Sequence, residues 1–297
     1  MRPPKRKPFT ATARSLAVAS GALVLGFTTF FGAFDAPDRQ GANVADLATV
    51  VSPREAQASV ASLRITYAAR ISGHRIGTGV LSANLDGDRY TATLNARTTA
   101  VGRLVSPGQG EAVSRGIFGN AVPVPVSYDL SASEDEFTNT VRMRLRRGDI
   151  AELSAEPPLS EHPHRVAVRA QHRRDVVDPL SALLMPVPNV ESAAGPAACD
   201  RTIPLFDGRQ RFDVAFSFVR MEQVQFGNGQ AAVCRMRYRP IAGHRSNRRA
   251  NQELAANNDI YVWLTQVGDE ALVAPVRMEV GLEFGKLSVQ AIEFAAR

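Results

Sequence analysis

The chain has 297 residues, of which 44% are hydrophobic and 22% are charged, so it can build one large β domain or two ordinary domains around a real core. Its formal net charge of +6 points toward nucleic acid or anionic lipid. Residues 1–58, however, hold seven Lys/Arg and four Asp/Glu, which leaves 28 against 25 and a net charge of +3 for the rest, so we exclude nucleic acid as a partner.

The N-terminus has the layout of an export signal. Residues 1–14 carry five basic and no acidic side chains, and residues 15–34, "SLAVASGALVLGFTTFFGAF", carry no charge. A basic segment before an apolar one directs export, and twenty residues also reach across a bilayer. We therefore predict that residues 1–34 are an export signal or a membrane anchor and that the protein works in the periplasm.

Residues 35–58 are expected to form a linker or processing region. Ala56 and Ala58 place small residues at the −3 and −1 positions before Ser59, as a cleavage site requires. This site lies far beyond the apolar run. Cleavage, or retention in the inner membrane through residues 15–34, therefore both remain open.

From residue 59 to residue 297 the sequence predicts a single antiparallel, barrel-like β domain. Three strand-like segments come first, Leu63–Ile71, Gly77–Leu85 and Tyr90–Thr98, and the second and third flank Asp86-Gly87-Asp88. Asp-Gly between alternating apolar runs is a strong hairpin signal. Later strands include "RMRLRR" and "CRMRYRP", where arginine alternates with apolar residues as on a sheet with one solvated face. The fold class is all-β, with a large curved antiparallel sheet forming an open barrel or β-spiral.

One or two short helices are expected besides the strands. One helical turn is predicted within residues 105–118. The other helix is predicted in "DPLSALLMPV", where Asp178 is the N-cap, Pro179 is the first helical residue and Pro186 ends the helix.

The two cysteines, Cys199 and Cys234, bracket a predicted hairpin that turns at Asp207-Gly208. No CxxC motif or histidine at metal-binding spacing accompanies them, so we expect no zinc site. In an exported protein an even number of cysteines favours a disulfide, which contributes on the order of 3–4 kcal/mol for a loop of this length. A redox-active pair is the alternative.

Candidate chemistry is limited to histidine and arginine clusters. His162, His164 and His172 lie close together, but Pro163 and neighbouring arginines argue against a metal site, and we predict no metal and no cofactor. Ser181 sits in no Gly-x-Ser-x-Gly motif. A loop over residues 240–249 gathers cations that can receive phosphate or carboxylate. Its candidate ligand-binding residues are His244, Arg245 and Arg248.

Four segments stand in a characteristic order over roughly residues 60–295: "ITYAARISGHRIGTG", "DPLSALLMPV", "CDRTIPLFDGRQRFDV" and "CRMRYRPIAGHR". They resemble segments of the bacterial exported family called domain of unknown function 3108, in particular of its alpha-proteobacterial members. The resemblance implies a periplasmic, mostly antiparallel barrel-like or spiral domain. It implies no established activity, so it transfers no catalytic residue.

Two function classes follow from these observations. The favoured one is a non-enzymatic envelope protein that binds a lipid, peptide or protein partner on its curved sheet and contacts the membrane only through its N-terminal segment. The alternative is a periplasmic hydrolase or transferase acting on envelope glycans or lipids, with its site at His244 and Arg245 or at residues 162–172. Convergent carboxylates and histidines would favour catalysis, and an apolar concave face would favour binding.

Overall fold

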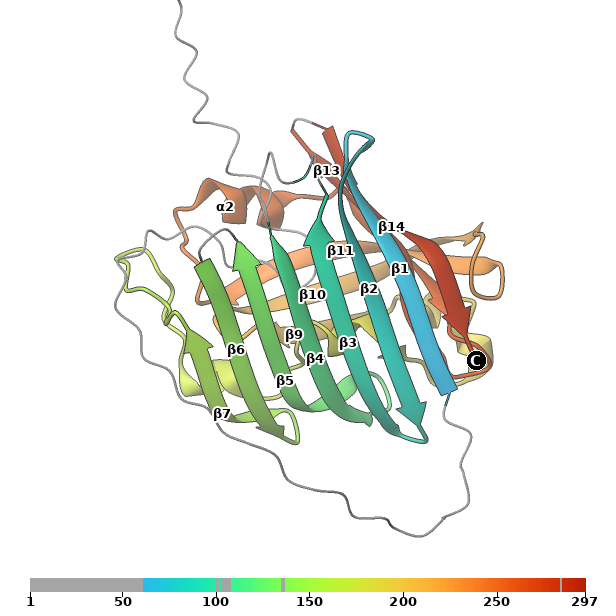
Figure 1. Ribbon diagram of the computed structural model, residues 1–297, viewed down its shortest axis with the longest axis horizontal. Helices are drawn as coiled ribbons and strands as arrows, with labels where there is room; N and C mark the ends of the chain where they lie inside the picture. Colours follow the sequence, from blue (N-terminus) through green and yellow to red (C-terminus); the bar gives the residue numbers. More distant parts are fainter. Residues whose placement is uncertain (1–60, 100–101, 103–107, 135–136, 284) are drawn as a thin grey trace, which may run out of the picture.

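Fourteen strands form one antiparallel sheet in the computed structural model, which describes residues 61–99, 102, 108–134, 137–283 and 285–297 (Figure 1). The predictions for residues 1–58 lie outside these residues. The strands are β1 (Ala61–Ile71), β2 (His74–Asp86), β3 (Arg89–Thr98), β4 (Gln109–Phe118), β5 (Pro123–Glu134), β6 (Phe137–Arg146), β7 (Asp149–Glu156), β8 (Met185–Pro186), β9 (Arg201–Phe206), β10 (Arg211–Gln223), β11 (Gln230–Ala242), β12 (Ile260–Gln266), β13 (Leu272–Leu282) and β14 (Gly285–Ala296).

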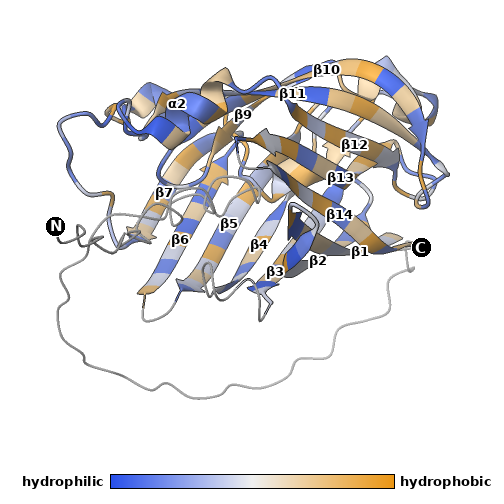
Figure 2. Ribbon diagram, turned by 90° about the horizontal axis from the view of Figure 1, so that it is seen from above, coloured by the Kyte–Doolittle hydropathy of each residue, from blue (hydrophilic) through white to orange (hydrophobic). Residues whose placement is uncertain are grey.

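The strand order is β7-β6-β5-β4-β3-β2-β1-β14-β13-β12-β11-β10-β9, and β8 pairs with β13 outside this path. Strands β2 to β7 form one layer, and β9 to β11 cross behind it at a steep angle (Figures 1 and 2). Strands β1, β14 and β13 connect the two layers. The end strands β7 and β9 do not pair with each other, so the sheet is an open barrel, as the sequence predicts.

Local sequence explains most of the hairpins. The predicted turn at Asp86-Gly87-Asp88 is present, and Gly87 adopts a positive φ of 59°, which glycine accepts without steric cost. The predicted turn at Asp207-Gly208 likewise joins β9 to β10, with φ of 95° at Gly208. The first three predicted strands are confirmed as β1, β2 and β3.

Hydrophobic and hydrophilic residues alternate along many of the strands (Figure 2). On β6, Val141 and Met143 are fully buried, whereas Arg142 and Arg144 point to solvent. The solvated arginine face predicted from "RMRLRR" is confirmed. The arginines of "CRMRYRP" in β11 are also exposed.

The connection between β7 and β9 runs through the inside of the open barrel. Every residue from 176 to 187 is buried. Leu180 and Leu184 pack into one core cluster that contains residues of β1 to β6 and also of β9 and β11 to β14. Ala182 and Met185 pack into a second cluster with β9 to β14. The connection therefore fills the space between the two layers, and we call residues 176–187 the plug.

The helix predicted for "DPLSALLMPV" is wrong in extent, because this segment forms only one 3-10 turn, Ser181–Leu183, before strand β8. Met185 and Pro186 pair with β13 as strand β8, so their backbone is extended and cannot continue a helix. The other short helices are η1 (Ala170–Arg173), η3 (Val190–Ala193), η4 (Pro196–Ala198) and α2 (Arg249–Ala256).

Two further expectations concern residues 105–118 and 240–249. Residues 109–118 form strand β4, because β3 and β5 hydrogen-bond to it on both sides. Residues 105–107, where the predicted helical turn opens, lie outside the described residues. Residues 240–249 are not one loop, since β11 continues to Ala242 and α2 begins at Arg249. The run "RANQELAA" consists largely of good helix formers, which explains α2. Among the described residues no helix is long and apolar enough to cross a membrane.

The plug bridges the gap between the two end strands. The N–H of Val176 donates to the carbonyl of Gly148, next to β7, at 2.9 Å. The N–H of Val177 donates to the carbonyl of Pro204 in β9 at 2.8 Å. One end of the open side is thereby closed by backbone hydrogen bonds.

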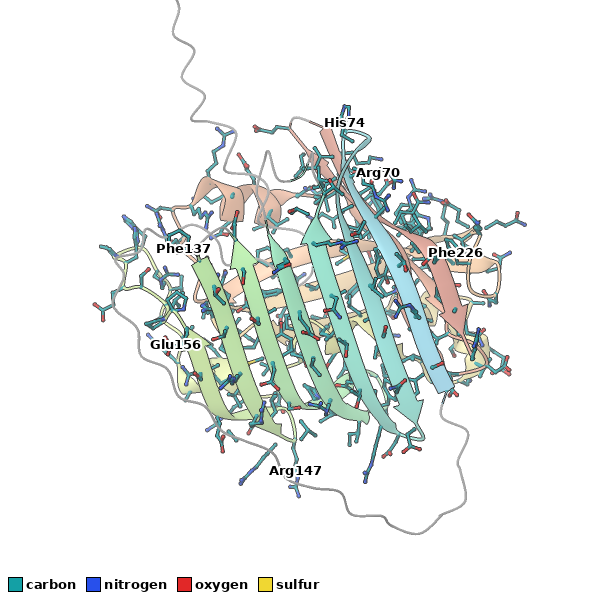
Figure 3. All side chains as sticks on the ribbon, in the orientation of Figure 1. Arg70, His74, Phe137, Arg147, Glu156 and Phe226 are labelled. Carbon is teal, nitrogen blue, oxygen red and sulfur yellow. A yellow bond between two sulfur atoms is a disulfide. The ribbon has the colours of Figure 1, made fainter. Side chains whose placement is uncertain are left out.

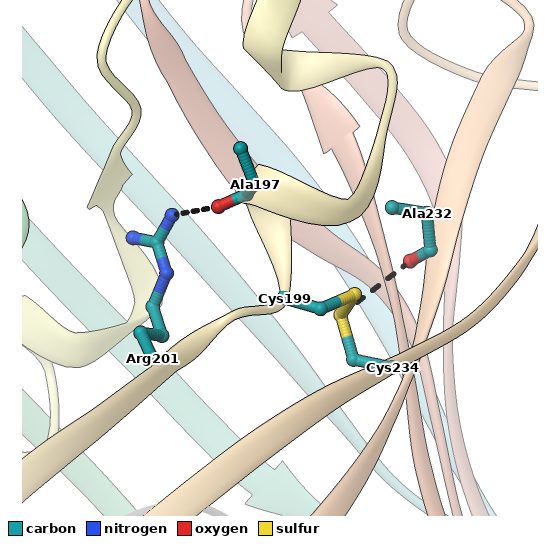
Figure 4. The surroundings of a disulfide bond; sticks show 5 residues. All are labelled: Ala197, Cys199, Arg201, Ala232 and Cys234. Carbon is teal, nitrogen blue, oxygen red and sulfur yellow. Dashed lines mark hydrogen bonds between the residues drawn. A yellow bond between two sulfur atoms is a disulfide. The ribbon is translucent and has the colours of Figure 1, made fainter.

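Cys199 and Cys234 form the expected disulfide, with their Cα atoms 5.4 Å apart (Figure 4). Cys199 follows η4, and Cys234 lies on β11, two strands away from β9. Both cysteines are fully buried. The bond fixes the end of the connection to the middle of the second layer, as a structural staple would.

Candidate functional site

Two partly buried segments that are far apart in the sequence pair beside the barrel. Arg165 in the connection after β7 faces Arg245 after β11 in an isolated antiparallel bridge. The N–H of Val166 donates to the carbonyl of His244 at 3.0 Å and fixes this pairing. The histidine segment and the arginine loop, which the sequence offers as separate candidates, are therefore one place on the surface.

Gly243 makes this approach possible. Its φ is 84°, and a Cβ at this position would lie 2.1 Å from the carbonyl oxygen of Arg209. Any other residue would push the backbone away from the β9–β10 turn. The glycine therefore determines where Arg245 is placed.

The guanidinium of Arg165 is held by backbone and hydroxyl oxygens. Its Nη1 donates to the carbonyl of Gly243 at 2.6 Å, and its Nε donates to the carbonyl of Ser160 at 2.8 Å. A third, longer bond joins Nη2 to Ser160 Oγ at 3.3 Å. These bonds orient the cation before any ligand arrives and keep its positive charge unneutralised.

Further cations lie within electrostatic reach of Arg165. Burial, followed by the charges of Arg245 and Arg248, lowers the pKa of Arg165. Partial desolvation, followed by the charges of Arg245, His164 and Arg165, lowers the pKa of His162. We call these five residues the cationic cluster: His162, His164, Arg165, Arg245 and Arg248.

In the described part of the chain, no carboxylate neutralises the charge of Arg165 or Arg245. Neither residue takes part in an ion pair there. The buried Nε of Arg245 also has no hydrogen-bond partner among the described residues. Like charges held together repel one another, so a bound anion such as phosphate or carboxylate would stabilise the arrangement.

The structure places the site residues predicted from the sequence in different surroundings. Arg245 and Arg248 lie in the cationic cluster. The side chain of His244 is half-buried beside it, and burial lowers its pKa, so its imidazole favours the neutral form. His172 lies on η1, where its Nδ1 accepts from the N–H of Arg169 at 3.1 Å. Among the described residues no three His, Cys, Asp or Glu side chains gather as metal ligands.

Arg165 is the site residue that sequence reasoning missed. Nothing in "EHPHRVAVRAQH" distinguishes it from other solvated arginines, because its importance depends on a segment beyond β11. The only available signal was that both candidate segments are rich in histidine and arginine.

A second polar group lies inside the barrel, around the carboxylate of Asp178. Oδ1 accepts from the N–H groups of Leu180 and Ser181, both at 2.9 Å. The N-cap of the short turn is Leu180 rather than the predicted Asp178, but the Asp178 carboxylate still holds the start of the turn. Oδ2 accepts from the hydroxyls of Ser181 and Ser114. The hydroxyl of Tyr90 lies 2.7 Å from Ser181 Oγ.

This Asp178 network joins the plug to strands β3 and β4. Asp178, Ser181 and Ser114 are all fully buried, and burial raises the pKa of Asp178 despite its four donors. A serine beside a carboxylate is the beginning of a nucleophilic site, but a substrate cannot reach these atoms. The network therefore holds the plug in place.

Asp207 is a second buried carboxylate, in the β9–β10 turn. Oδ1 accepts from the N–H groups of Arg209 and Gln210 at 2.8 and 2.6 Å, whereas the buried Oδ2 has no partner among the described residues. Burial raises the pKa of Asp207 to about 6. The neighbouring guanidinium of Arg209 donates to the carbonyl of Pro157 at 2.9 Å, close to Glu156 at the end of β7 (Figure 3).

This chain is similar to a solved structure and to a protein family. A solved structure described as a beta-barrel-like protein of domain of unknown function DUF1849 from Brucella abortus is similar, with 9% sequence identity and a TM-score of 0.45 over 80% of this chain and 98% of that one. A search of the curated proteins finds no match. Residues 62–291 match the family described as "Protein of unknown function (DUF3108)". That match covers nearly all of the barrel, and the chain belongs to this DUF3108 family.

Proposed function

We propose that this protein is an exported cell-envelope protein that acts by binding rather than by catalysis, and that the cationic cluster receives an anionic group of its partner. One observation carries the proposal. Two arginines and two histidines lie around the guanidinium of Arg165, although they come from one segment before β9 and another after β11. Three hydrogen bonds orient that guanidinium.

Export is supported by two features. The basic and apolar N-terminal segments have the layout of a signal, and the buried disulfide suits an oxidising compartment such as the periplasm.

Binding is favoured over hydrolysis or group transfer by where the reactive groups lie. The serine and carboxylate groups that could act as nucleophile and base are those of the Asp178 network, which is closed to solvent. The half-buried His162 and the exposed His164 lie among guanidinium groups, which attract anions and do not activate a nucleophile.

The test is a titration of the full-length protein with inorganic phosphate, in which calorimetry measures the binding affinity. Arg165→Gln with Arg245→Gln removes two cations of the cluster, and Arg142→Gln with Arg146→Gln removes two exposed cations of β6 as a matched control. We expect at least tenfold weaker binding in the first double variant and little change in the second.

Vesicles of phosphatidylglycerol or phosphatidylcholine distinguish a lipid headgroup from free phosphate. A loss of binding to phosphatidylglycerol vesicles in the cluster variant alone would identify an anionic headgroup as a ligand. Equal phosphate affinity of the two double variants, or no binding by the native protein, would refute the proposal.

A further inference from the structure

A cleft of about 510 Å³ opens at a part of the barrel that the cationic cluster does not include. It lies where the β2–β3, β4–β5 and β12–β13 turns meet the chain after β8. Its volume falls within the ~300–1,000 Å³ typical of ligand sites. Apolar side chains supply much of its lining, including Leu85, Phe118, Val187, Pro188 and Leu272.

The walls of the cleft are tied to one another. The N–H of Phe118 donates to the carbonyl of Asp88 at 2.7 Å, and the N–H of Val187 donates to the carbonyl of Ala271 at 2.9 Å. The ring of Phe118 packs on Tyr90, with centroids 5.0 Å apart, and Tyr90 belongs to the Asp178 network. The cleft is thereby formed before a ligand arrives, which lowers the entropic cost of binding.

The charge of the cleft is negative. Asp88 comes from the β2–β3 turn and Glu270 from the β12–β13 turn, and both are exposed. Neither forms an ion pair within the described ranges, and no residue that lines the cleft is cationic. The nearby guanidinium of Arg201 donates to the carbonyls of Ala121 and Pro186. These bonds hold the wall of the cleft together, and Arg201 does not line the cleft itself.

We propose that this cleft binds a segment of a partner protein that presents a lysine or arginine next to an apolar side chain. The apolar lining takes the apolar side chain, and the two carboxylates, from separate turns, take the cation. The amide of Asn120, also exposed at the cleft, offers hydrogen bonds to a peptide backbone. The inference is independent of the cationic cluster, whose ligand has the opposite charge.

The probes are the peptides acetyl-Phe-Lys-Leu-amide and acetyl-Phe-norleucine-Leu-amide, which differ only in the charged ammonium group at the end of the central side chain. Each is titrated to millimolar concentration into the full-length protein, and amide shifts are followed by NMR. We expect at least tenfold tighter binding of the lysine peptide, weaker binding at high salt, and the largest shifts at Phe118, Val187 and Leu272.

Asp88→Asn with Glu270→Gln is expected to reduce the affinity for the lysine peptide at least tenfold. Glu111→Gln with Glu152→Gln removes two exposed carboxylates elsewhere on the sheet and is expected to leave it unchanged. Equal binding of both peptides by the native protein would overturn the proposal whether or not the cleft variant folds. Equal losses in the two double variants, or shifts away from the cleft, would overturn it as well.

Discussion

Arg165 and Arg245 face each other across an isolated antiparallel bridge, although the plug and the three strands β9, β10 and β11 separate them in the sequence. A pairing of two cations on a surface is unfavourable unless other groups compensate for it. The oriented guanidinium of Arg165 and the nearby histidines make this pairing the basis of the proposed binding site.

The Asp178 network predicts a graded loss of stability. Asp178→Ala leaves two N–H groups and two hydroxyls without their acceptor in the core, and we expect the free energy of unfolding to fall by about 3 kcal/mol or more. Ser114→Ala removes only one donor, and we expect a loss of about 1 kcal/mol. Urea denaturation measures both values. Equal effects of the two substitutions would show that the carboxylate is not the centre of the network.

Asp207 predicts a pH dependence of stability. Its pKa is raised from 3.8 to about 6 by burial, so between these values the folded protein keeps a proton that the unfolded chain has lost. The free energy of unfolding should therefore fall as the pH rises from about 4 to about 6 and then level off, by about 3 kcal/mol in all.

Urea denaturation at several pH values isolates this contribution when the native protein is compared with Asp207→Asn. The difference between their stabilities should change across that window and stay constant above it. Parallel pH profiles would contradict the assignment to Asp207.

The disulfide predicts a large loss of stability when both cysteines are replaced. Cys199→Ala with Cys234→Ala opens a loop with a sequence separation of 35, and we expect a loss of about 4 kcal/mol from the greater entropy of the unfolded chain. Thermal unfolding of the native protein in reducing buffer serves as the control and should show a similar decrease. An unchanged melting temperature in the double variant would exclude a stabilising role.

Gly208 predicts an energetic coupling between the β9–β10 turn and β6. A Cβ at Gly208 would lie 2.4 Å from Cγ1 of Val141, and its φ is positive. Gly208→Ala should therefore cost about 2 kcal/mol through strain and overlap. In a double-mutant cycle, Val141→Ala should relieve part of this cost, so the double variant loses less than the sum of the singles. Additive losses would show that the turn does not press on β6.

The hairpins could be predicted from the sequence because their signals are local. Asp86-Gly87 and Asp207-Gly208 occupy turns that require positive φ, and the flanking strands alternate between apolar and polar residues. The solvated arginines of β6 and β11 follow from the same period of two.

The plug and the binding site depend on contacts between distant segments, and for this reason the sequence did not reveal them. Asp178 was predicted as a helix cap, and its carboxylate does accept from the N–H groups that lead into a turn, although the N-cap of that turn is Leu180. Its bond to Ser114 of β4 could not be foreseen. Without that bond, "DPLSALLMPV" looks like an ordinary surface helix. Arg165 likewise gains its place only when Gly243 turns the chain after β11 toward it.

The measurement that tests the central claim most directly is the titration of the His162 ring by NMR, with and without inorganic phosphate. Partial desolvation, followed by the charges of neighbouring cations, lowers the pKa of His162 in the free protein, so an anion bound in the cationic cluster should raise this pKa. The ring of His172, outside the cluster, is the internal reference. A rise at His162 that disappears in Arg165→Gln with Arg245→Gln is the predicted result. A titration of His162 that phosphate leaves unchanged would contradict anion binding at this site.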